Sequence, residues 1–247
     1  MENILVSIIT VSYNSEKTIR DTIESVLHQT YKNIEYIIVD GLSADNTVGI
    51  AESYREKFAE KGYRYHIISE KDNGIYDAMN KGIKNTEGKL VGIINSDDWY
   101  EVDAIETIVK QYQKYHYDMM YADLRIWKEN GTTTVKHARL RKYATTRDWN
   151  HPTTFIARNV YDKYLYKCES IYDDWDMILH VRESSLKIRT INKILANFRT
   201  GGVSNQKRIG KAIERCKIRY KIYRNHGYSR LYAIECFLME FAKYCAL

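Results

Sequence analysis

The sequence is poor in residues that interrupt or cross-link a chain. It contains one proline, Pro152, and 12 glycines in 247 residues, so neither a proline-rich nor a glycine-rich linker is predicted. Its four cysteines, Cys168, Cys216, Cys236 and Cys245, are widely spaced and form no C-x-x-C pair. This spacing disfavours a zinc-binding motif or a disulfide framework and indicates buried, reduced thiols.

Two kinds of phosphate-binding loop are also absent. No G-x-G-x-x-G follows the first apolar run and no G-x-x-x-x-G-K-[ST] occurs, which disfavours a dinucleotide oxidoreductase and a P-loop enzyme. The first residues lack the basic start and cleavage site of a secretory signal. No run reaches the roughly 18 uncharged apolar residues that span a bilayer. We therefore expect a cytoplasmic protein.

The charge is unevenly distributed along a chain of ordinary globular composition, with 44% hydrophobic and 28% charged residues. The net charge is +6, and residues 206–247 hold 10 Lys or Arg against 3 Asp or Glu. The rest of the chain is therefore close to neutral. Its basic character belongs to the C-terminal segment.

The first hundred residues alternate between strand and helix patterns. Apolar runs rich in Val and Ile, typical of strands buried on both faces, occupy 5–11, 36–39, 65–68 and 90–94. Between them, apolar residues at helical spacing predict a helix capped by Ser15 and further helices over 46–61 and 75–84. This alternation predicts an α/β fold with a mostly parallel sheet flanked by helices.

The pattern changes after residue 100. A helix over 103–115 precedes two strands, 119–127 and 132–135, which Asn130-Gly131 joins as a hairpin. The remaining expected elements are strands 153–157 and 188–191, a helix over 174–181 and two closing helices. We expect a body of residues 1–204, with halves at 1–100 and 101–204, and a basic helical extension over 205–247.

Polar loops follow each of the four early strands. They read Ser12-Tyr13-Asn14, Asp40-Gly41-Leu42-Ser43-Ala44-Asp45, Ser69-Glu70-Lys71-Asp72-Asn73-Gly74 and Asn95-Ser96-Asp97-Asp98. A single such loop is explained by solvation or helix capping, but four at the carboxyl edge of one parallel sheet predict a binding crevice. Asp97 and Asp98 add hard oxygen ligands, which suit Mg²⁺ or Mn²⁺ shared with phosphate oxygens.

Four blocks of the chain carry a family resemblance: Ser7–Asn14 (SIITVSYN), Ile37–Thr47 (IIVDGLSADNT), Gly74–Ile83 (GIYDAMNKGI) and Asn95–Asp98 (NSDD). In order and spacing they resemble the signature of the family 2 glycosyltransferases. The likeness is strong over residues 6–98, looser over 148–204 and absent beyond 205. It implies a GT-A-like fold and inverting sugar transfer from a nucleoside-diphosphate donor, most simply a UDP-sugar, in bacterial surface polysaccharide synthesis.

The resemblance also implies residue roles. The nucleotide-sugar would be bound by Val11, Tyr13, Asp40, Lys71, Asp72 and Asp97, the last at the ribose or the sugar. Asp98 would ligate a divalent cation, Mn²⁺ or Mg²⁺. The acidic motif reads Ser96-Asp97-Asp98 rather than Asp-x-Asp, which leaves open whether Asp97 also touches the cation.

The acceptor half offers a base for inverting transfer, which must deprotonate the acceptor hydroxyl. Asp173-Asp174-Trp175-Asp176 stands at a predicted helix start, where acids also serve as caps. The segment resembles the family's second acidic motif, and Asp174 matches the catalytic base. Trp175 would either stack on a sugar or lie in the core.

Two further features of this half stay open. His151, before Pro152, would line the acceptor site, orient the donor diphosphate or be structural. The Gly201-Gly202 turn in Arg199–Ser204 resembles a late glycine turn of the family and fits either a closing loop or a simple turn.

The C-terminal extension combines apolar stripes with basic faces. The stripes, at heptad-like spacing, indicate helices that pack on the body or on each other. The basic faces would lie on an anionic membrane, at the inner face where a glycan or polyprenyl-diphosphate-linked acceptor is presented. They comprise Lys207, Arg208, Lys211, Arg215, Lys217, Arg219, Lys221 and Arg224. Nucleic acid is the rival partner, but nothing else in the chain supports it.

Two other functions fit parts of the pattern. A sugar-phosphate nucleotidyltransferase would need a loop rich in Gly and Arg after the first strand, where this chain has Ser12-Tyr13-Asn14. A non-catalytic module that binds nucleotide-sugars would not need both Asp98 and Asp174. The sequence therefore favours a metal-dependent glycosyltransferase of the hexosyltransferase type.

Overall fold

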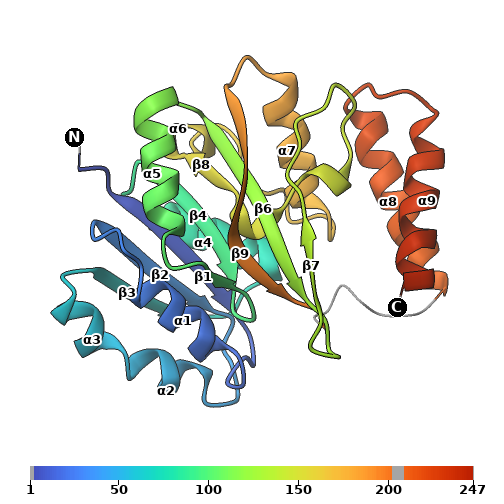
Figure 1. Ribbon diagram of the computed structural model, residues 1–247. Coiled ribbons are helices and arrows are strands. Elements are labelled where there is room, and N and C mark those ends of the chain that lie inside the picture. The colour runs from blue at the N-terminus through green and yellow to red at the C-terminus, as the bar shows by residue number, and fades with distance from the viewer. Residues whose placement is uncertain (1–2, 202–208, 247) are drawn as a thin grey trace.

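A nine-stranded sheet organises the chain (Figure 1). The computed structural model describes residues 3–201 and 209–246. The strand order is β3-β2-β1-β4-β8-β6-β9-β5, and β7 pairs with β6. Helices cover both faces of the sheet, so the predicted α/β class is confirmed.

The first half consists of four parallel strands: β1 (Val6–Ser12), β2 (Ile34–Asp40), β3 (Arg64–Ser69) and β4 (Leu90–Asn95). Every residue of β1 and β2 is buried, as expected for apolar runs covered on both faces. The helices α1 (Ile19–Leu27), α2 (Thr47–Glu52) and α3 (Arg55–Glu60) lie on one face, and α4 (Ile75–Lys84) lies on the other. Right-handed crossovers require this, because the chain reverses its direction across the sheet after β3.

Two helix predictions in this half were wrong in detail. The cap of α1 is Thr18, while the Ser15 hydroxyl donates to the Tyr13 carbonyl at 3.2 Å. The helix expected over 46–61 is divided into α2 and α3 at Ser53 and Tyr54. The Ser53 hydroxyl donates to the Ile50 carbonyl at 2.6 Å, a local bond that competes with the helical ladder.

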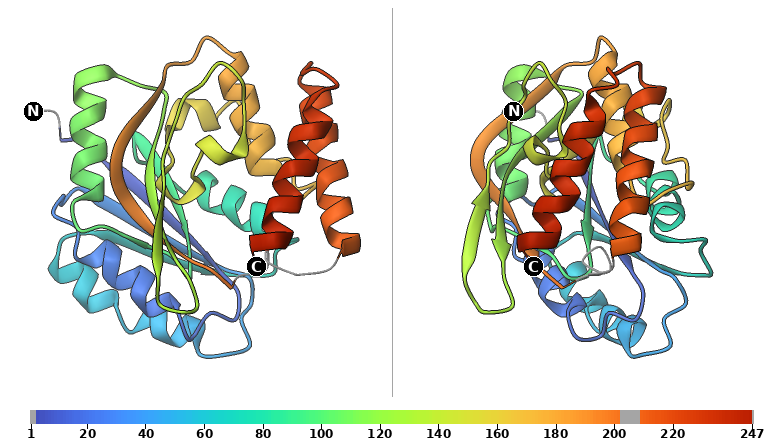
Figure 2. Two further views of the ribbon diagram at one scale, coloured as in Figure 1. Left: turned by 45° about the vertical axis from the view of Figure 1, so that its right-hand side comes forward. Right: turned by 90° about the vertical axis from the view of Figure 1, so that its right-hand side faces the viewer.

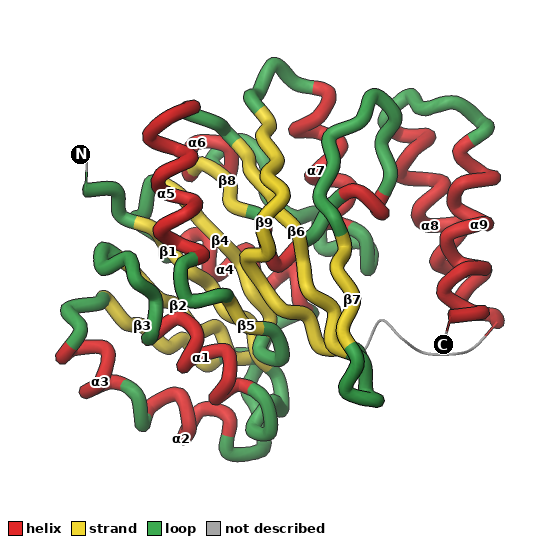
Figure 3. The backbone as a smooth tube through the Cα atoms, in the orientation of Figure 1, coloured by secondary structure: helices red, strands yellow, loops and turns green. Residues whose placement is uncertain are grey.

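The second half adds a mixed portion to the sheet (Figure 3). β6 (Met119–Trp127) pairs antiparallel with β8 (Phe155–Ala157) and parallel with β9 (Ile188–Arg199), and β8 joins β4. The short strands β5 (Trp99–Tyr100) and β7 (Thr133–Lys136) pair with β9 and β6. β9 is longer than predicted because the ladder shifts register opposite Ala122–Leu124, which breaks the alternation that marks a strand.

Five helices support this half and the C-terminus. They are α5 (Ala104–Tyr115), α6 (Arg158–Tyr161), α7 (Asp173–Glu183) and the pair α8 (Ile209–Asn225) and α9 (Tyr232–Ala246). Two 3₁₀ turns, Thr146–Asp148 and His151–Thr153, precede β8. The α8–α9 hairpin stands beside α7 at one end of the molecule (Figure 2).

A buried ion network fixes this hairpin. Glu240 is 4% exposed and accepts from Arg219 Nη2 at 2.6 Å and from Arg215 Nε at 2.8 Å. Arg219 Nη2 also donates to the Tyr172 hydroxyl at 2.8 Å, directly before α7. The expectation that Arg215 and Arg219 face a membrane was therefore wrong, because their charge is used inside the hairpin. Lys207 and Arg208 lie outside the described residues.

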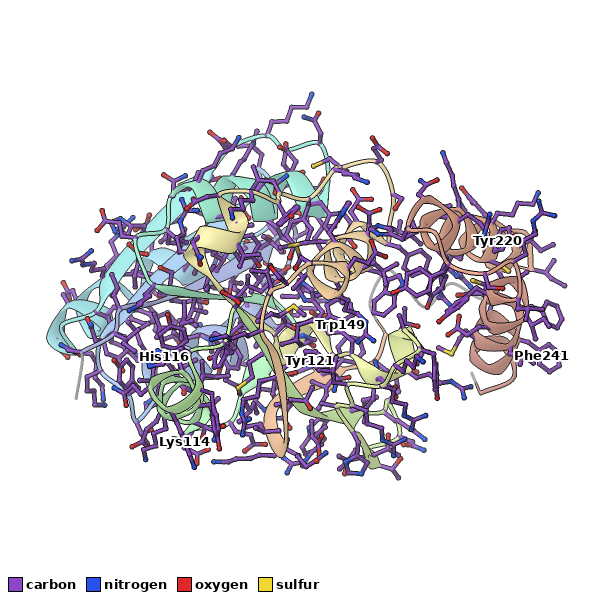
Figure 4. All side chains as sticks on the ribbon, turned by 90° about the horizontal axis from the view of Figure 1, so that it is seen from above. Lys114, His116, Tyr121, Trp149, Tyr220 and Phe241 are labelled. Atoms are coloured by element: carbon purple, nitrogen blue, oxygen red, sulfur yellow. The ribbon has the colours of Figure 1, made fainter. Side chains whose placement is uncertain are left out.

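The outer face of the hairpin is apolar. The sequence predicted that its apolar stripes pack inward, but Ile209, Ile213, Ile234, Leu238 and Phe241 are each more than half exposed. Phe241 points away from the body in Figure 4. Ala212, Ile222, Tyr223 and Cys236 are buried instead. Among the described residues, no helix is both long and apolar enough to cross a bilayer.

Candidate active site

Asp40 connects three of the four polar loops, which meet at the carboxyl edge of the parallel strands as predicted. Its carboxylate has no exposed surface. It accepts from Ser12 Oγ at 3.2 Å, from the Ser43 N–H at 2.9 Å and from Ser69 Oγ at 2.9 Å. In this structure Asp40 thus holds the loops in place, and its contact with a nucleotide stays a prediction.

Tyr13, Gly41 and Asp72 lie together above this carboxylate. Tyr13 is 66% exposed. A β-carbon at position 41 would stand 2.4 Å from Asp72 Oδ2 and 3.4 Å from Tyr13 Cδ2, so only glycine permits this approach. Asp72 Oδ1 accepts from the Gly74 N–H at 2.9 Å, which orients the carboxylate. Of the other residues predicted here, Lys71 is exposed, and Val11 is buried within β1.

The acidic pair after β4 is enclosed to different degrees. Asp98 has no exposed surface; its Oδ1 accepts from the Arg199 N–H at 3.1 Å, and its buried Oδ2 has no hydrogen-bond partner among the described residues. Burial, and then the Asp97 charge, raises the pKa of Asp98 well above its usual value. Burial also raises the pKa of Asp97, which keeps some exposed surface. Because both pKa values are raised and one carboxylate oxygen is unpaired, a cation bound here would stabilise the ionised form of the pair.

Arg199, at the end of β9, is a site residue that the sequence did not identify. Besides its N–H bond to Asp98, it donates from Nη2 to Asp21 Oδ2 at 2.7 Å, and its guanidinium lies 5.1 Å from the Trp99 ring centre. It opens the segment Arg199–Ser204, in which Gly201 has φ of 115° and Gly202–Ser204 lie outside the described residues. The resemblance drew attention to this segment through its glycines, not through the arginine.

The three acids at the start of α7 have separate environments. Asp173 is buried and accepts from the N–H groups of Glu169 and Ser170 at 2.7 and 2.9 Å. Asp176 is buried and bonds to Lys167 Nζ at 2.8 Å. Asp174 lines a small cavity of about 10 Å³ that is walled by Ile93, Trp149, His151, Thr154, Ile156, Tyr161, Tyr166 and Ile178. Of the three, Asp174 faces a space where a reacting hydroxyl could lie.

Two features connect the region around Asp174 with β4 and with α4, the helix that follows the loop after β3. Ile93, in the wall of the cavity, lies on β4 two residues before Asn95. Tyr76, on α4, donates to the Ile171 carbonyl at 3.0 Å, and burial followed by the Asp174 charge raises its pKa well above the usual value. Sequence reasoning missed Tyr76, whose signal is only its position two residues after Gly74 in the third block of the family resemblance.

Trp175 and His151 take narrower roles than the sequence allowed. Trp175 is 1% exposed and packs against Trp149 and Tyr223, with ring centres 5.9 and 6.0 Å apart, so the sugar-stacking role was wrong because no face of the ring is available. His151 lines the Asp174 cavity. Burial lowers the pKa of His151 to about 4, so the ring is neutral at pH 7 and provides no positive charge for a diphosphate.

A second group of metal-ligand side chains, Asp176, His180 and His226, lies where α7 meets the hairpin. The described residues thus offer two places with the chemistry of a divalent-cation site. One is an all-oxygen site at the strand ends, and the other is a mixed nitrogen and oxygen site on the helices.

The chain resembles characterised sequence families and solved structures. The model for glycosyl transferase family 2 matches residues 7–173. The glycosyltransferase GlyA of Streptococcus pneumoniae is 27% identical over 177 residues, covering 72% of this chain and 24% of the relative. EpsH of Bacillus subtilis is 39% identical over 110 residues, covering 44% and 31%. The chain therefore spans about a quarter to a third of the length of these relatives.

Two solved structures share the fold. The fragment of S. aureus TarS that comprises residues 1–349 has a TM-score of 0.68 at 17% identity, covering 98% of this chain and 72% of the fragment, and was also solved with UDP and with UDP-GlcNAc. The mannosyltransferase PcManGT of Pyrobaculum calidifontis, in complex with GDP-Man and Mn²⁺, has a TM-score of 0.69 at 14% identity, covering 100% and 75%. The predicted GT-A-like fold is confirmed by these likenesses.

We predict that His151 makes the fold sensitive to mild acid. Its pKa of about 4 in the folded chain lies below the value of about 6.5 in an unfolded chain, so the unfolded state binds the proton more tightly. The free energy of unfolding should therefore fall as the pH drops from about 6.5 towards 4. Urea unfolding across this range should show a smaller fall for His151→Gln than for wild type. An NMR titration that places the His151 transition between pH 6 and 7 would refute the prediction.

Proposed function

This chain belongs to glycosyltransferase family 2, and from that premise we propose that it transfers a sugar from a nucleoside-diphosphate donor to a hydroxyl group, with inversion at the anomeric carbon. The observation that supports this most is the placement of Asp174 in a cavity against β4, the strand that ends in the acidic pair. Membership of this family sets aside the nucleotidyltransferase alternative. The acceptor we propose is a glycan or polyprenyl-diphosphate-linked saccharide of a bacterial surface polysaccharide.

The donor nucleotide would lie over the loops that Asp40 holds together. The exposed Tyr13 ring offers a stacking face for a base, and Asp72 offers a carboxylate oxygen beside Gly41. Lys71 and Val11 belong to the same edge of the sheet. The complexes of TarS with UDP-GlcNAc and of PcManGT with GDP-Man support a nucleotide-sugar donor, and we propose a UDP-sugar.

Asp174 would act as the base. As the acceptor oxygen forms its bond to the anomeric carbon, its proton passes to the Asp174 carboxylate. The bond from the anomeric carbon to the diphosphate oxygen breaks on the opposite side, and its electron pair leaves with the nucleoside diphosphate. A neutral His151 fits the wall of this cavity, because it can donate or accept one hydrogen bond without adding charge beside the base.

Asp97 and Asp98 would hold the divalent cation, Mn²⁺ or Mg²⁺, which stabilises the charge that develops on the leaving diphosphate. The different burial of Asp97 and Asp98 indicates that the two acids have different roles, which the sequence did not predict. Asp97 keeps exposed surface, whereas Asp98 is enclosed. We propose that Asp97 faces the cation and that Asp98 supports it from behind.

Replacing the base should slow transfer without affecting donor binding. Asp174→Asn should lower the rate of transfer by about 10²–10⁴-fold, the usual contribution of a general base, because the amide takes up no proton. Turnover and donor affinity would be measured together, with the exposed Asp162→Asn as a matched control that should change neither. If donor affinity falls as far as the rate, Asp174 serves binding or folding instead.

The two acids after β4 should respond differently to substitution. Asp97→Asn should abolish metal-dependent turnover, while Asp98→Asn should raise the Mn²⁺ concentration needed for half-maximal rate by about 10–100-fold, as expected for a residue behind a ligand. Asparagine keeps the oxygen that accepts from the Arg199 N–H, so the fold should persist. Loss of turnover in Asp98→Asn alone would assign ligation to Asp98.

We also propose that the outer face of the hairpin docks on an anionic membrane, where a lipid-linked acceptor would be presented. The hairpin exposes the apolar side chains of this face together with the basic residues Lys211, Lys217, Lys221 and Arg224. An apolar stripe bordered by lysine is typical of helices that lie in the membrane interface. Each basic residue near anionic lipid contributes on the order of 1 kcal/mol, screened by salt.

Anionic vesicles should therefore retain the protein at low salt and release it at high salt. Lys217→Glu with Lys221→Glu should weaken retention while hydrolysis of a soluble donor is unchanged. The control is Lys61→Glu with Lys110→Glu, which makes the same charge change directly after α3 and on α5. It should leave retention intact. A wild-type protein that ignores anionic vesicles at every salt concentration would show that this face has no membrane role.

A further inference from the structure

Asp176, His180 and His226 bring three metal-ligand atoms together outside the proposed transferase site. Asp176 and His180 are four residues apart on α7, which places them on one face of the helix. His226 follows the last residue of α8. One ligand atom from each residue lies within 4.8 Å of the others.

The geometry converges on one point. His226 Nε2 lies 3.2 Å from Asp176 Oδ1, and His180 Nε2 lies 3.5 Å from Asp176 Oδ2. The two imidazole rings have centres 4.4 Å apart. The side chains of Asp176 and His226 are buried, whereas that of His180 is 39% exposed. Three protein ligands with one side open to solvent are typical of a zinc site that keeps a position for water.

A further carboxylate orients one of these ligands. His226 Nδ1 lies 2.7 Å from Glu183 Oε2 and its Nε2 lies 3.2 Å from Asp176 Oδ1, so the ring stands between two carboxylates. A metal ion would replace the proton at Nε2, while the N–H at Nδ1 would continue to donate to Glu183. This carboxylate–histidine arrangement is the one that supports metal-bound imidazole in proteins. Tyr164 stacks on His180, with ring centres 5.7 Å apart, and limits its rotation.

We propose that Asp176, His180 and His226 bind a divalent transition-metal ion, Zn²⁺ in preference to Mg²⁺, that fastens the C-terminal hairpin to α7. Two imidazole nitrogens and one carboxylate oxygen suit Zn²⁺, whereas Mg²⁺ selects oxygen ligands. This site is therefore distinct in chemistry from the pair Asp97 and Asp98. The ion would link α7, whose first turn carries Asp174, to the end of α8.

Lys167 is the competitor for this site. Its Nζ lies 2.8 Å from Asp176 Oδ2 and 3.1 Å from Asp176 Oδ1, and its side chain is about two-fifths exposed. A metal ion must displace this ammonium group from the carboxylate. The exchange is feasible because a half-exposed ion pair contributes little net stability.

The test is Zn²⁺ titration of the full chain after treatment with a chelator, followed by calorimetry and by thermal unfolding. We expect one Zn²⁺ per chain and a rise in the melting temperature with Zn²⁺. His180→Ala should weaken binding by at least about tenfold, and Lys167→Ala should strengthen it by roughly two- to fivefold, the effect of removing one half-exposed ion pair.

The controls separate this site from other zinc-binding groups. His28→Ala removes an exposed histidine directly after α1 that pairs with a glutamate four residues earlier, and it should leave binding unchanged. Asp97→Asn should also retain the Zn²⁺. His180 rather than the buried His226 is chosen for substitution, because replacing the partly exposed His180 leaves no enclosed cavity. No saturable binding by wild type, or equal binding by His180→Ala, overturns the proposal, and so does weaker binding by Lys167→Ala.

Discussion

The donor side of the site depends on one buried carboxylate. Removing Asp40 from water is costly unless its oxygens accept hydrogen bonds, and charge-assisted bonds to hydroxyl and N–H donors meet that cost. The donors are Ser12, Ser43 and Ser69, one from each of three loops. Tyr13 and Gly41 stand next to Ser12 and Asp40 in sequence, and Asp72 follows Ser69 by three residues. Their meeting above the sheet is a consequence of how Asp40 is satisfied.

The acceptor side also depends on how its carboxylates are paired. Asp173 fixes the turn at Glu169 and Ser170, and Asp176 bonds towards Lys167 and the hairpin. Because Asp173 and Asp176 bond to groups in different directions, the orientation of the first turn of α7 is fixed. Asp174 is consequently directed to the cavity beside β4. The selection among three adjacent acids is made by their partners rather than by their intrinsic chemistry.

The parts that the sequence predicted correctly are those with local signals. β1, β2 and β4 are largely apolar runs because both of their faces are covered, and α4 and β6 have the predicted bounds. The carboxyl-end rule then located the polar loops. The bond between Asp98 and Arg199 joins residues 101 positions apart, and no local pattern announces it. Burial likewise decided Trp175, since an aromatic after two acids is more often part of the core but can also stack on a sugar.

The α8–α9 hairpin exposes apolar side chains on its outer face and buries an ion network inside. That network connects the hairpin to the proposed active site. Arg219 and Glu240 are buried together, an arrangement that is stable only when both charges are paired, and removing Glu240 would leave the Arg219 charge uncompensated. Their partner Tyr172 directly precedes Asp173 and Asp174. The exposed aliphatic face is unfavourable in water and favourable against an apolar surface. Arg219 and Tyr172 thus connect the hairpin directly to the turn of α7 that carries the proposed base.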